Sequence, residues 1–489
     1  MPRLKNLTVL AIAAILMSVT APATTIAGGV DLPTTCSAQA DDTVDEGLTL
    51  LHNMMYIQAE AAFNRAAESD PNCAMAQWGI AMSNFHPLWP GEPSDGETTR
   101  GSTAAKRLEA MEPGSDLENA LAAAASAFYS PGHSGYGERL AAWAAAQIAS
   151  HDKNPDNIDA AALAALARMA TTPRDPERVA TFAAIGDVLD GLHKKAPDHT
   201  GVIHYAIHAY DNPALKQRGI PYAQIYDKVS PSAPHALHMP AHIFTRVGRW
   251  EESINLNRRS AEAAIEQSGD VLQSHYVHAV DYMVYALIQM GKTEQAEMLV
   301  DEMLAKRNHQ VTFGGAFALA ASPMRLVLEQ DQWTEAAALS PVLHPDIPWQ
   351  KFPQAVAMLW FTKGLGAARA GDVENALKAI DELKSLLETM QKGGAKYWSE
   401  LTKGHILTVE AWIELAKGNS DLAVTLQTKA ADLEDQIGKS PVTPGHVLPA
   451  RELLGDVYRQ LSRSDEAATA YRASLALYPN RARSLAALN

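Results

Sequence analysis

Three short runs of histidine in the middle of the chain are spaced as metal ligands on helices would be. Nine of the 17 histidines lie between His193 and His278. Seven of these nine form the runs His204 and His208; His235, His238 and His242; His275 and His278. Positions three, four or seven apart share one face of a helix, so each run projects its imidazoles in one direction. Histidine is the commonest metal-binding side chain, and we therefore predict that these seven histidines bind metal.

Two aspartates strengthen this interpretation. Asp211 and Asp281 each follow the last histidine of a run by three residues. A single histidine pair would more often be packed or solvated, but three runs in one quarter of the chain favour a metal site. The alternative is that the histidines hydrogen-bond one another or an acidic peptide, which requires no metal.

The ligand types indicate one or two divalent ions, copper or zinc. Imidazoles suit zinc, copper or nickel, and six or more of them can hold two ions with three ligands each. The chain lacks the Glu-x-x-His pairs of di-iron bundles and the His-Glu-x-x-His motif of zinc proteases. A paired copper centre and a zinc ion with an open position both remain compatible with the sequence.

Each metal predicts its own chemistry on a small or peptidic substrate. Zinc with an open position would activate water as a hydrolase, with Asp211 or Asp281 as the base or as a residue that orients a ligand. Copper near tyrosines such as Tyr285 could oxidise a substrate with oxygen. Asp211, Asp281 and Tyr285 are thus the predicted catalytic residues.

The elements that must position these side chains are helices, because the apolar residues recur with a period of 3.6 and alanine is abundant. Two distant segments also share one pattern of small, aromatic and proline residues. Gly47, Ala59, Phe63, Ala66 and Pro71 are separated by 12, 4, 3 and 5 residues, and the segment from Gly455 to Pro479 repeats these offsets. The pattern resembles the tetratricopeptide repeat, a helical hairpin of about 34 residues. We expect an all-α solenoid of such hairpins.

Weaker copies of the turn between the two helices of a hairpin begin at Gly248, Gly291, Asp331, Gly371 and Gly418. The resemblance implies that the first helix of each repeat lines a concave groove. Counting back from these turns places His235, His238 and His242 at groove positions of one repeat. It places His278, Asp281 and Tyr285 at the same positions of the next repeat.

Long irregular stretches rich in proline, glycine, serine and threonine are expected in the N-terminal half, between Pro87 and Gly114 and between Ser130 and Gly137. The expected organisation has four parts: 1–27, a signal peptide; 38–130, hairpins with a loop insertion; 138–310, the histidine-rich repeats; 311–489, C-terminal repeats.

The first residues have the three-part pattern of a secretory signal peptide, with cleavage after Ala23 or Ala27. No later stretch is long and apolar enough to be a transmembrane helix, so we expect a periplasmic or secreted protein without membrane insertion after cleavage. Export would expose Cys36 and Cys73 to an oxidising compartment, where they either form a disulfide or remain unpaired core residues. The net charge of -15 excludes nucleic acid as a partner.

Residues 204–211 (HYAIHAYD) and 233–244 (APHALHMPAHIF) resemble a family of exported bacterial tetratricopeptide-repeat proteins. The resemblance implies the fold, whereas the functional hypotheses rest on the residues. The first hypothesis is a metal-dependent enzyme, either a hydrolase or a copper oxidoreductase. The others are a scaffold that grips a protein or peptide partner in its groove, and a protein for metal storage or delivery.

Overall fold

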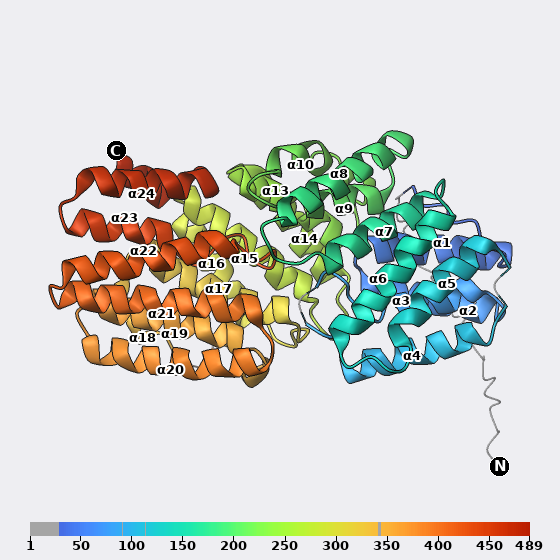
Figure 1. Cartoon of the computed structure of the whole chain (residues 1–489), viewed down its shortest axis with the longest axis horizontal. Coiled ribbons are helices and arrows are strands. Elements are labelled where there is room, and N and C mark those ends of the chain that lie inside the picture. The colour runs from blue at the N-terminus through green and yellow to red at the C-terminus, as the bar shows by residue number, and fades with distance from the viewer. Residues whose placement is uncertain (1–28, 90, 113, 341–343) are drawn as a thin grey trace, which may run out of the picture.

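The structure is a computed structural model that describes residues 29–489 except 90, 113 and 341–343. The described part is all-α, with helices packed side by side as antiparallel hairpins (Figure 1). The predicted signal peptide and its cleavage sites lie outside the described residues. None of the described helices is long and apolar enough to cross a bilayer.

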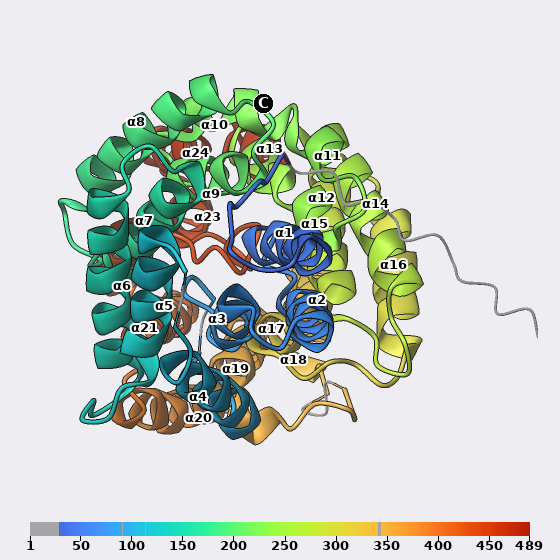
Figure 2. The same cartoon turned by 90° about the vertical axis from the view of Figure 1, so that its right-hand side faces the viewer.

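The N-terminal part of the chain forms a curved layer of helices. Its elements are α1 (Ala38–His52), α2 (Tyr56–Ser69), α3 (Ala74–Met82), α4 (Asp95–Glu109), α5 (Asp116–Tyr129), α6 (Tyr136–Lys153), α7 (Ile158–Thr171), α8 (Arg178–Lys195) and α9 (Thr200–Tyr210). Seen along the long axis, α1 and α3 lie toward the middle of the curve and the later helices form its rim (Figure 2).

The middle of the chain begins with four short helices and continues with three longer ones. They are α10 (Lys216–Ala223), α11 (Tyr226–Val229), α12 (Pro234–His238), α13 (Pro240–Arg246), α14 (Trp250–Glu266), α15 (Ser274–Gln289) and α16 (Thr293–Ala305). A helix across all three histidines of the second run would need a backbone N–H from Pro240, which proline lacks. The helix is therefore broken at Met239, and α12 and α13 follow each other as separate elements.

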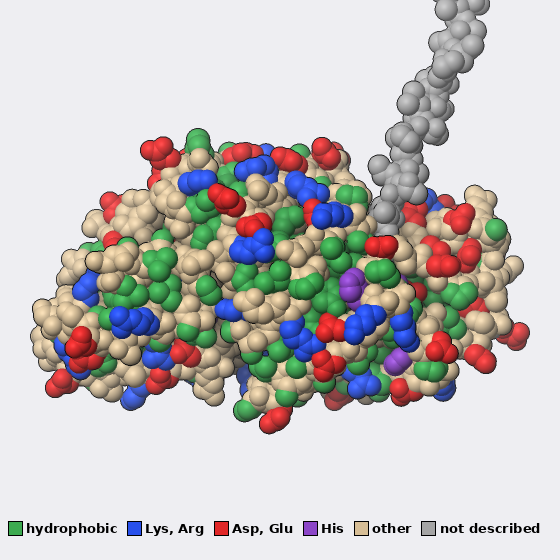
Figure 3. Space-filling model, turned by 90° about the horizontal axis from the view of Figure 1, so that it is seen from above, with side chains coloured by type: hydrophobic (Ala, Val, Ile, Leu, Met, Phe, Trp, Pro, Cys, Tyr) green, Lys and Arg blue, Asp and Glu red, His purple; other side chains and the backbone are tan. Residues whose placement is uncertain are grey.

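The C-terminal half is a regular stack of hairpins. Its elements are α17 (Phe313–Glu329), α18 (Trp333–Ala338), the 3-10 helix η1 (Trp349–Lys351), α19 (Pro353–Arg369), α20 (Val373–Lys392), α21 (Lys396–Ala416), α22 (Ser420–Ile437), α23 (Ala450–Gln460), α24 (Ser464–Leu477) and α25 (Ala482–Leu488). On one broad face of the molecule, acidic and basic side chains are interspersed (Figure 3).

All five predicted turns lie between helices of a hairpin. The residues Gly248, Gly291, Asp331, Gly371 and Gly418 have left-handed backbones, with φ between 56° and 84°. Glycine adopts this conformation without strain, and aspartate is one of the few other residues that tolerate it. The prediction of helical hairpins is confirmed at each of these turns.

The two matched repeats close in the same way. A Cβ atom on Gly47 would lie 2.8 Å from the ring of Phe63, and one on Gly455 would lie 2.6 Å from the ring of Tyr471. The glycines therefore allow the aromatic residue of the second helix to pack directly against the backbone of the first.

The expected irregular stretch between Pro87 and Gly114 is found only at its two ends. Residues 95–109 form α4, so this part of the loop prediction is corrected. The reason is a capping box, in which the Ser94 hydroxyl accepts from the backbone N–H of Glu97 and the Glu97 side chain accepts from the backbone N–H of Ser94. Such reciprocal capping starts a helix even where the composition is poor in apolar residues.

A disulfide joins Cys36 to Cys73 and ties the N-terminal arm to the start of α3. It closes a loop across a sequence separation of 37 residues. Replacing both cysteines by serine should lower the free energy of unfolding by about 4 kcal/mol, because the unfolded chain regains the entropy of the open loop. Urea unfolding of the oxidised protein and of the double variant measures this loss, and equal midpoints would contradict it.

Candidate metal centre

The structure regroups the histidine runs into two triads. The first triad consists of His204 and His208 from α9 and His235 from α12; the second consists of His238 from α12, His242 from α13 and His278 from α15. In each triad one ring nitrogen per residue lies within 4.8 Å of the corresponding nitrogens of the other two. The triads are adjacent, since the ring centroids of His235 and His238 are 6.2 Å apart.

In the second triad, hydrogen bonds fix the ring orientation of two histidines. Asn257 donates its Nδ2 to the Ser253 carbonyl at 2.8 Å, so its Oδ1 accepts from Nδ1 of His238 at 2.6 Å. The Nδ1 of His242 donates to Oδ2 of Asp211 at 2.9 Å. Both protons are therefore on Nδ1, and both Nε2 atoms present lone pairs.

These two lone pairs face each other. The Nε2 atoms of His238 and His242 are 2.9 Å apart. Two acceptors at this distance repel each other unless a cation lies between them, and a proton is disfavoured there. Burial and the neighbouring histidines His278 and His242 lower the pKa of His238 well below its ordinary value. Burial also lowers the pKa of His242, despite the opposing effect of Asp211.

The first triad is held in a similar way. Nδ1 of His204 donates to the backbone carbonyl of His52 at 2.6 Å, which turns its Nε2 toward Nε2 of His208 at 3.1 Å. Burial, with a contribution from His242, lowers the pKa of His208 to about 3, so its ring is neutral at physiological pH. His235 is 7% exposed, and neither of its ring nitrogens has a hydrogen-bond partner. A buried imidazole without partners is costly, and a metal ion would satisfy it.

His275, the seventh predicted ligand, lies beside the first triad but outside both groups. Its ring centroid is 5.4 Å from that of His235 and 6.0 Å from that of Trp89. Burial lowers its pKa to about 4. His208, His275 and His278 are only partly buried, so the centre approaches solvent on this side.

Both carboxylate oxygens of Asp211 have polar partners. Its Oδ1 accepts from Nε of Arg246 at 2.7 Å, its Oδ2 accepts from His242, and Nζ of Lys439 lies 3.6 Å from Oδ2. Lys439 belongs to a buried segment, 439–449, between α22 and α23. Tyr282 covers the same triad, with its hydroxyl 3.4 Å from both ring nitrogens of His242.

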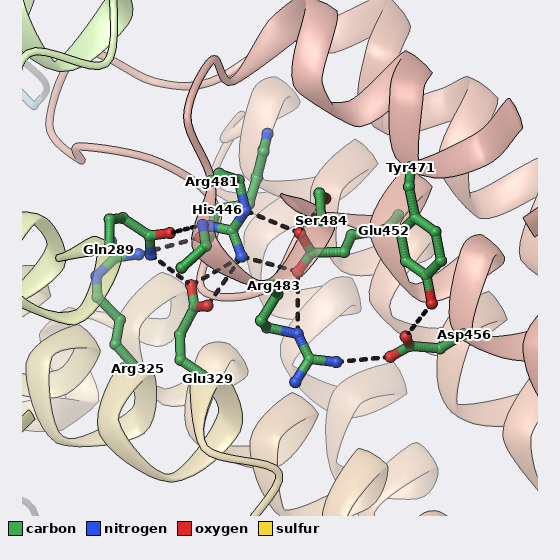
Figure 4. Close-up of polar contacts among 12 residues, drawn as sticks. Gln289, Arg325, Glu329, His446, Glu452, Asp456, Tyr471, Arg481, Arg483 and Ser484 are labelled. Carbon is green, nitrogen blue, oxygen red and sulfur yellow. Dashed lines mark hydrogen bonds and ion pairs between the residues drawn. The ribbon is translucent and has the colours of Figure 1, made fainter. Parts of the chain in front are cut away.

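Asp281 and Tyr285 contact the C-terminal half. The Oδ1 of Asp281 accepts from Arg325 at 2.9 Å and from Ser322 at 3.2 Å. The hydroxyl of Tyr285 accepts from Arg481 at 3.2 Å. Figure 4 shows Arg481 in a network of buried charges, with Arg325 nearby. The structure thus places Asp211 against a histidine triad. It places Asp281 in an ion pair with Arg325 and Tyr285 in a hydrogen bond with Arg481.

Several side chains that support the centre were not predicted. His52 supplies the carbonyl for His204, and its own ring connects Asp159 (2.9 Å) to the hydroxyl of Tyr205 (3.0 Å). His199 contacts the same oxygen of Asp159 at 3.0 Å. These residues are up to about 150 positions apart from the histidines they support, and no local spacing indicates such a contact.

His405 illustrates a buried histidine outside both triads. It stacks on Phe361 with ring centroids 4.0 Å apart, and burial lowers its pKa to about 3. In the unfolded chain His405 is protonated below about pH 6.5. In the folded chain its ring stays neutral down to about pH 3. Each pH unit between about 5.5 and 3 should therefore cost about 1.4 kcal/mol of stability through this residue. Urea unfolding at pH 5.5 and 4.5 measures how much the free energy of unfolding falls between these two pH values. This fall should be about 1.4 kcal/mol smaller in His405→Leu than in the wild type, and equal falls would contradict the assignment.

The comparisons with known proteins identify a repeat and no function. A tetratricopeptide repeat family model matches residues 448–481, which is the repeat formed by α23 and α24. No curated protein matches the chain. The chain therefore contains a tetratricopeptide repeat in this segment, and its described residues have an all-α hairpin architecture.

Similar solved structures include a Rap protein complexed with Competence and Sporulation Factor, which has 13% identity and a TM-score of 0.39 over 92% of this chain and 100% of that chain. The Cut9–Hcn1 structure of the APC/C has 14% identity and a TM-score of 0.38 over 94% and 78%. Yeast Tom70 has 14% identity and a TM-score of 0.32 over 92% and 94%. At these levels the likeness says nothing about the histidine centre.

Proposed function

We propose that the protein is a metalloprotein that binds two copper ions, one in each histidine triad, and acts as an oxidoreductase on a small substrate. The observation that carries this proposal is the pair of opposed lone pairs on His238 and His242, 2.9 Å apart in a buried site. Their Nδ1 partners, Asn257 and Asp211, form the outer layer of hydrogen bonds that is typical of metal-binding histidines.

The local charge favours copper over zinc. All six triad members are neutral donors, and the one carboxylate in contact with them, Asp211, is already neutralised by Arg246. In the reduced state, two Cu(I) ions bring two positive charges into this buried space, whereas two zinc ions bring four. In the oxidised state, Cu(II) binds nitrogen ligands more tightly than divalent zinc in general.

The same contacts weaken the hydrolase alternative. The hydrolase alternative assigns the general base to a carboxylate, which must accept a proton from water. Both oxygens of Asp211 are engaged, and although burial favours its neutral form, Arg246 and Lys439 hold its pKa well below the ordinary value. Asp211 is therefore better suited to orient His242 than to abstract a proton.

A copper pair at this position would supply two one-electron carriers, so that a donor could lose two electrons and two protons to dioxygen, which becomes hydrogen peroxide. The protein's own groups would keep the ligand rings neutral and correctly turned. Export to the periplasm or the medium is part of the proposal, because the Cys36–Cys73 disulfide suits an oxidising compartment.

Metal analysis after reconstitution tests this function. Protein stripped with a chelator and incubated with copper should retain one equivalent in each triad, and equimolar zinc should not displace these two ions. The variants His204→Ala/His208→Ala and His238→Ala/His242→Ala should each retain one equivalent less than the wild type, with unchanged helicity. His133→Ala, a lone histidine outside the triads, is the matched control and should match the wild type.

Failure to bind either copper or zinc would overturn the proposal and favour a peptide-binding scaffold. Binding of two ions without oxygen consumption or peroxide formation, across a panel of small phenolic and amine donors, would favour metal storage or delivery instead. Binding of zinc in preference to copper would restore the hydrolase alternative.

A further inference from the structure

A further cluster of potential metal ligands lies outside the two triads, where the segment between α16 and α17 meets the segment between α18 and η1. It consists of His309, His344 and Asp346, with one ligand atom from each residue within 4.8 Å of the others. The two histidines are 5% and 2% exposed, and Asp346 is partly buried. Their rings meet edge to face with centroids 4.8 Å apart. No local spacing indicates this cluster, because 35 positions separate its histidines.

His309 is the observation that points to a ligand. Neither of its ring nitrogens makes a hydrogen bond of good geometry, although the residue is almost fully buried and the Lys306 and Met303 backbones lie near the ring. Buried polar groups are nearly always hydrogen-bonded or bound to an ion. The backbone N–H of His309 also donates to Oδ2 of Asp346 at 3.4 Å, which holds this carboxylate beside the ring.

His344 is oriented as a metal ligand would be. Its Nε2 donates to the backbone carbonyl of Lys306 at 3.1 Å, so its lone pair is on Nδ1. Arg307 lies on the Nε2 side, at 3.3 Å, and its Nη1 donates to the same Lys306 carbonyl at 2.9 Å. The positive charge is thus on the side of the ring away from Nδ1. On the Nδ1 side, the backbone N–H of Asp346 donates to that nitrogen at 3.3 Å, a long hydrogen bond that a bound ion would replace.

We infer that His309, His344 and Asp346 form a third, separate site for a single divalent ion, and that this ion is zinc. Two imidazoles and one carboxylate form a common zinc ligand set with one position left to water. The anionic ligand distinguishes this site from the two triads, because it offsets part of the charge of a divalent ion.

The position of the site gives it a structural role. The segment of His309 pairs with the segment before α15: Leu272 donates to Asn308 and Gln310 donates to Leu272, both at 2.8 Å. The Gln310 side chain also accepts from the backbone N–H of Ser274, the first residue of α15, at 3.1 Å. Zinc at this site would fix the start of the helix that carries His275 and His278.

Titration of the metal-free protein with Co²⁺ and Zn²⁺ tests this inference. The absorption of tetrahedral Co²⁺ reports occupancy, and elemental analysis after zinc loading and gel filtration gives the stoichiometry. His309→Ala should bind one equivalent of zinc less than the wild type. Asp346→Asn, which preserves shape at a partly exposed position, should weaken that equivalent about tenfold or more. His133→Ala should match the wild type.

The outcomes separate this site from the triads. If the triads bind no metal but the third site does, the wild type binds one zinc ion and His309→Ala binds none. If the triads bind and the third site does not, His309→Ala and Asp346→Asn retain the full wild-type stoichiometry, and the inference is overturned. If His309→Ala loses helicity, its zinc stoichiometry is not interpretable. The zinc affinity of Asp346→Asn then decides whether the third site exists.

Discussion

Replacing Asp211 by asparagine should lower the free energy of unfolding by about 3–5 kcal/mol and weaken copper binding at the second triad by about 10- to 100-fold. Asp211 is 3% exposed at its side chain and pairs with Arg246 at 2.7 Å. Without its charge, Arg246 becomes a buried cation with no counter-charge. Burial already lowers the pKa of Lys439 to about 7, and this residue loses the carboxylate that favours its charged form. The amide also gives His242 a weaker acceptor, so its ring is less firmly oriented.

The measurements are urea unfolding of the metal-free variant and copper competition with a chelator of known affinity. Asp187→Asn is the matched control, because this aspartate pairs with Arg218 at 2.6 Å but is 70% exposed, where such a pair contributes about 1 kcal/mol or less. The first triad should keep its ion in both variants. Copper affinity of the second triad equal to that of the wild type would show that Asp211 does not support it.

Replacing Arg481 by methionine should destabilise the fold by a similar amount, about 3–5 kcal/mol, without removing a metal ligand. Figure 4 shows Arg481 between Glu329 and Glu452. Its Nη2 lies 2.8 Å from Glu452 and 2.9 Å from Glu329, and all three side chains are at most 1% exposed. Burial already raises the pKa of Glu329, although Arg481 opposes this. Without the cation, two carboxylates would remain buried with repulsion between them.

Urea unfolding of Arg481→Met at neutral pH measures the loss. The combined variant Arg481→Met/Glu329→Gln/Glu452→Gln should recover part of it, because neutral amides need no buried cation. Arg459→Met is the control, since this arginine is 55% exposed and 3.5 Å from Asp456. Unchanged stability of Arg481→Met would mean that the network of Figure 4 does not hold α25 against α15 and α17.

The repeat architecture was predictable because it depends on local patterns. Gly47 and Phe63 share their spacing with Gly455 and Tyr471, and the structure shows that each glycine admits the ring of its partner. The turns were recognisable because few residues accept a left-handed backbone. Helix α4 escaped prediction because its start is set by two polar residues, Ser94 and Glu97, within a segment whose composition suggested a loop.

The histidines were predictable as a set, but their grouping was not. Assigning His235, His238 and His242 to one face assumes a continuous helix, and Pro240 breaks that helix at Met239. The division between the triads falls within α12, where His235 joins the first triad and His238 joins His242 in the second. Contacts made across the fold, such as that of the His52 carbonyl with His204, have no signature in the local sequence. The same is true of Lys439, which reaches Asp211 from a segment more than 200 residues away.

Helix α12 has only five residues, yet it contributes His235 to the first triad and His238 to the second. Any ion that fixes His235 also restricts the backbone on which His238 is mounted. Part of the ordering entropy needed by the second ion is then already lost when the first one binds. The two binding events should be thermodynamically linked and reciprocal, with either ion raising the affinity for the other. Copper would therefore load in pairs, and singly occupied molecules would be scarce at half saturation.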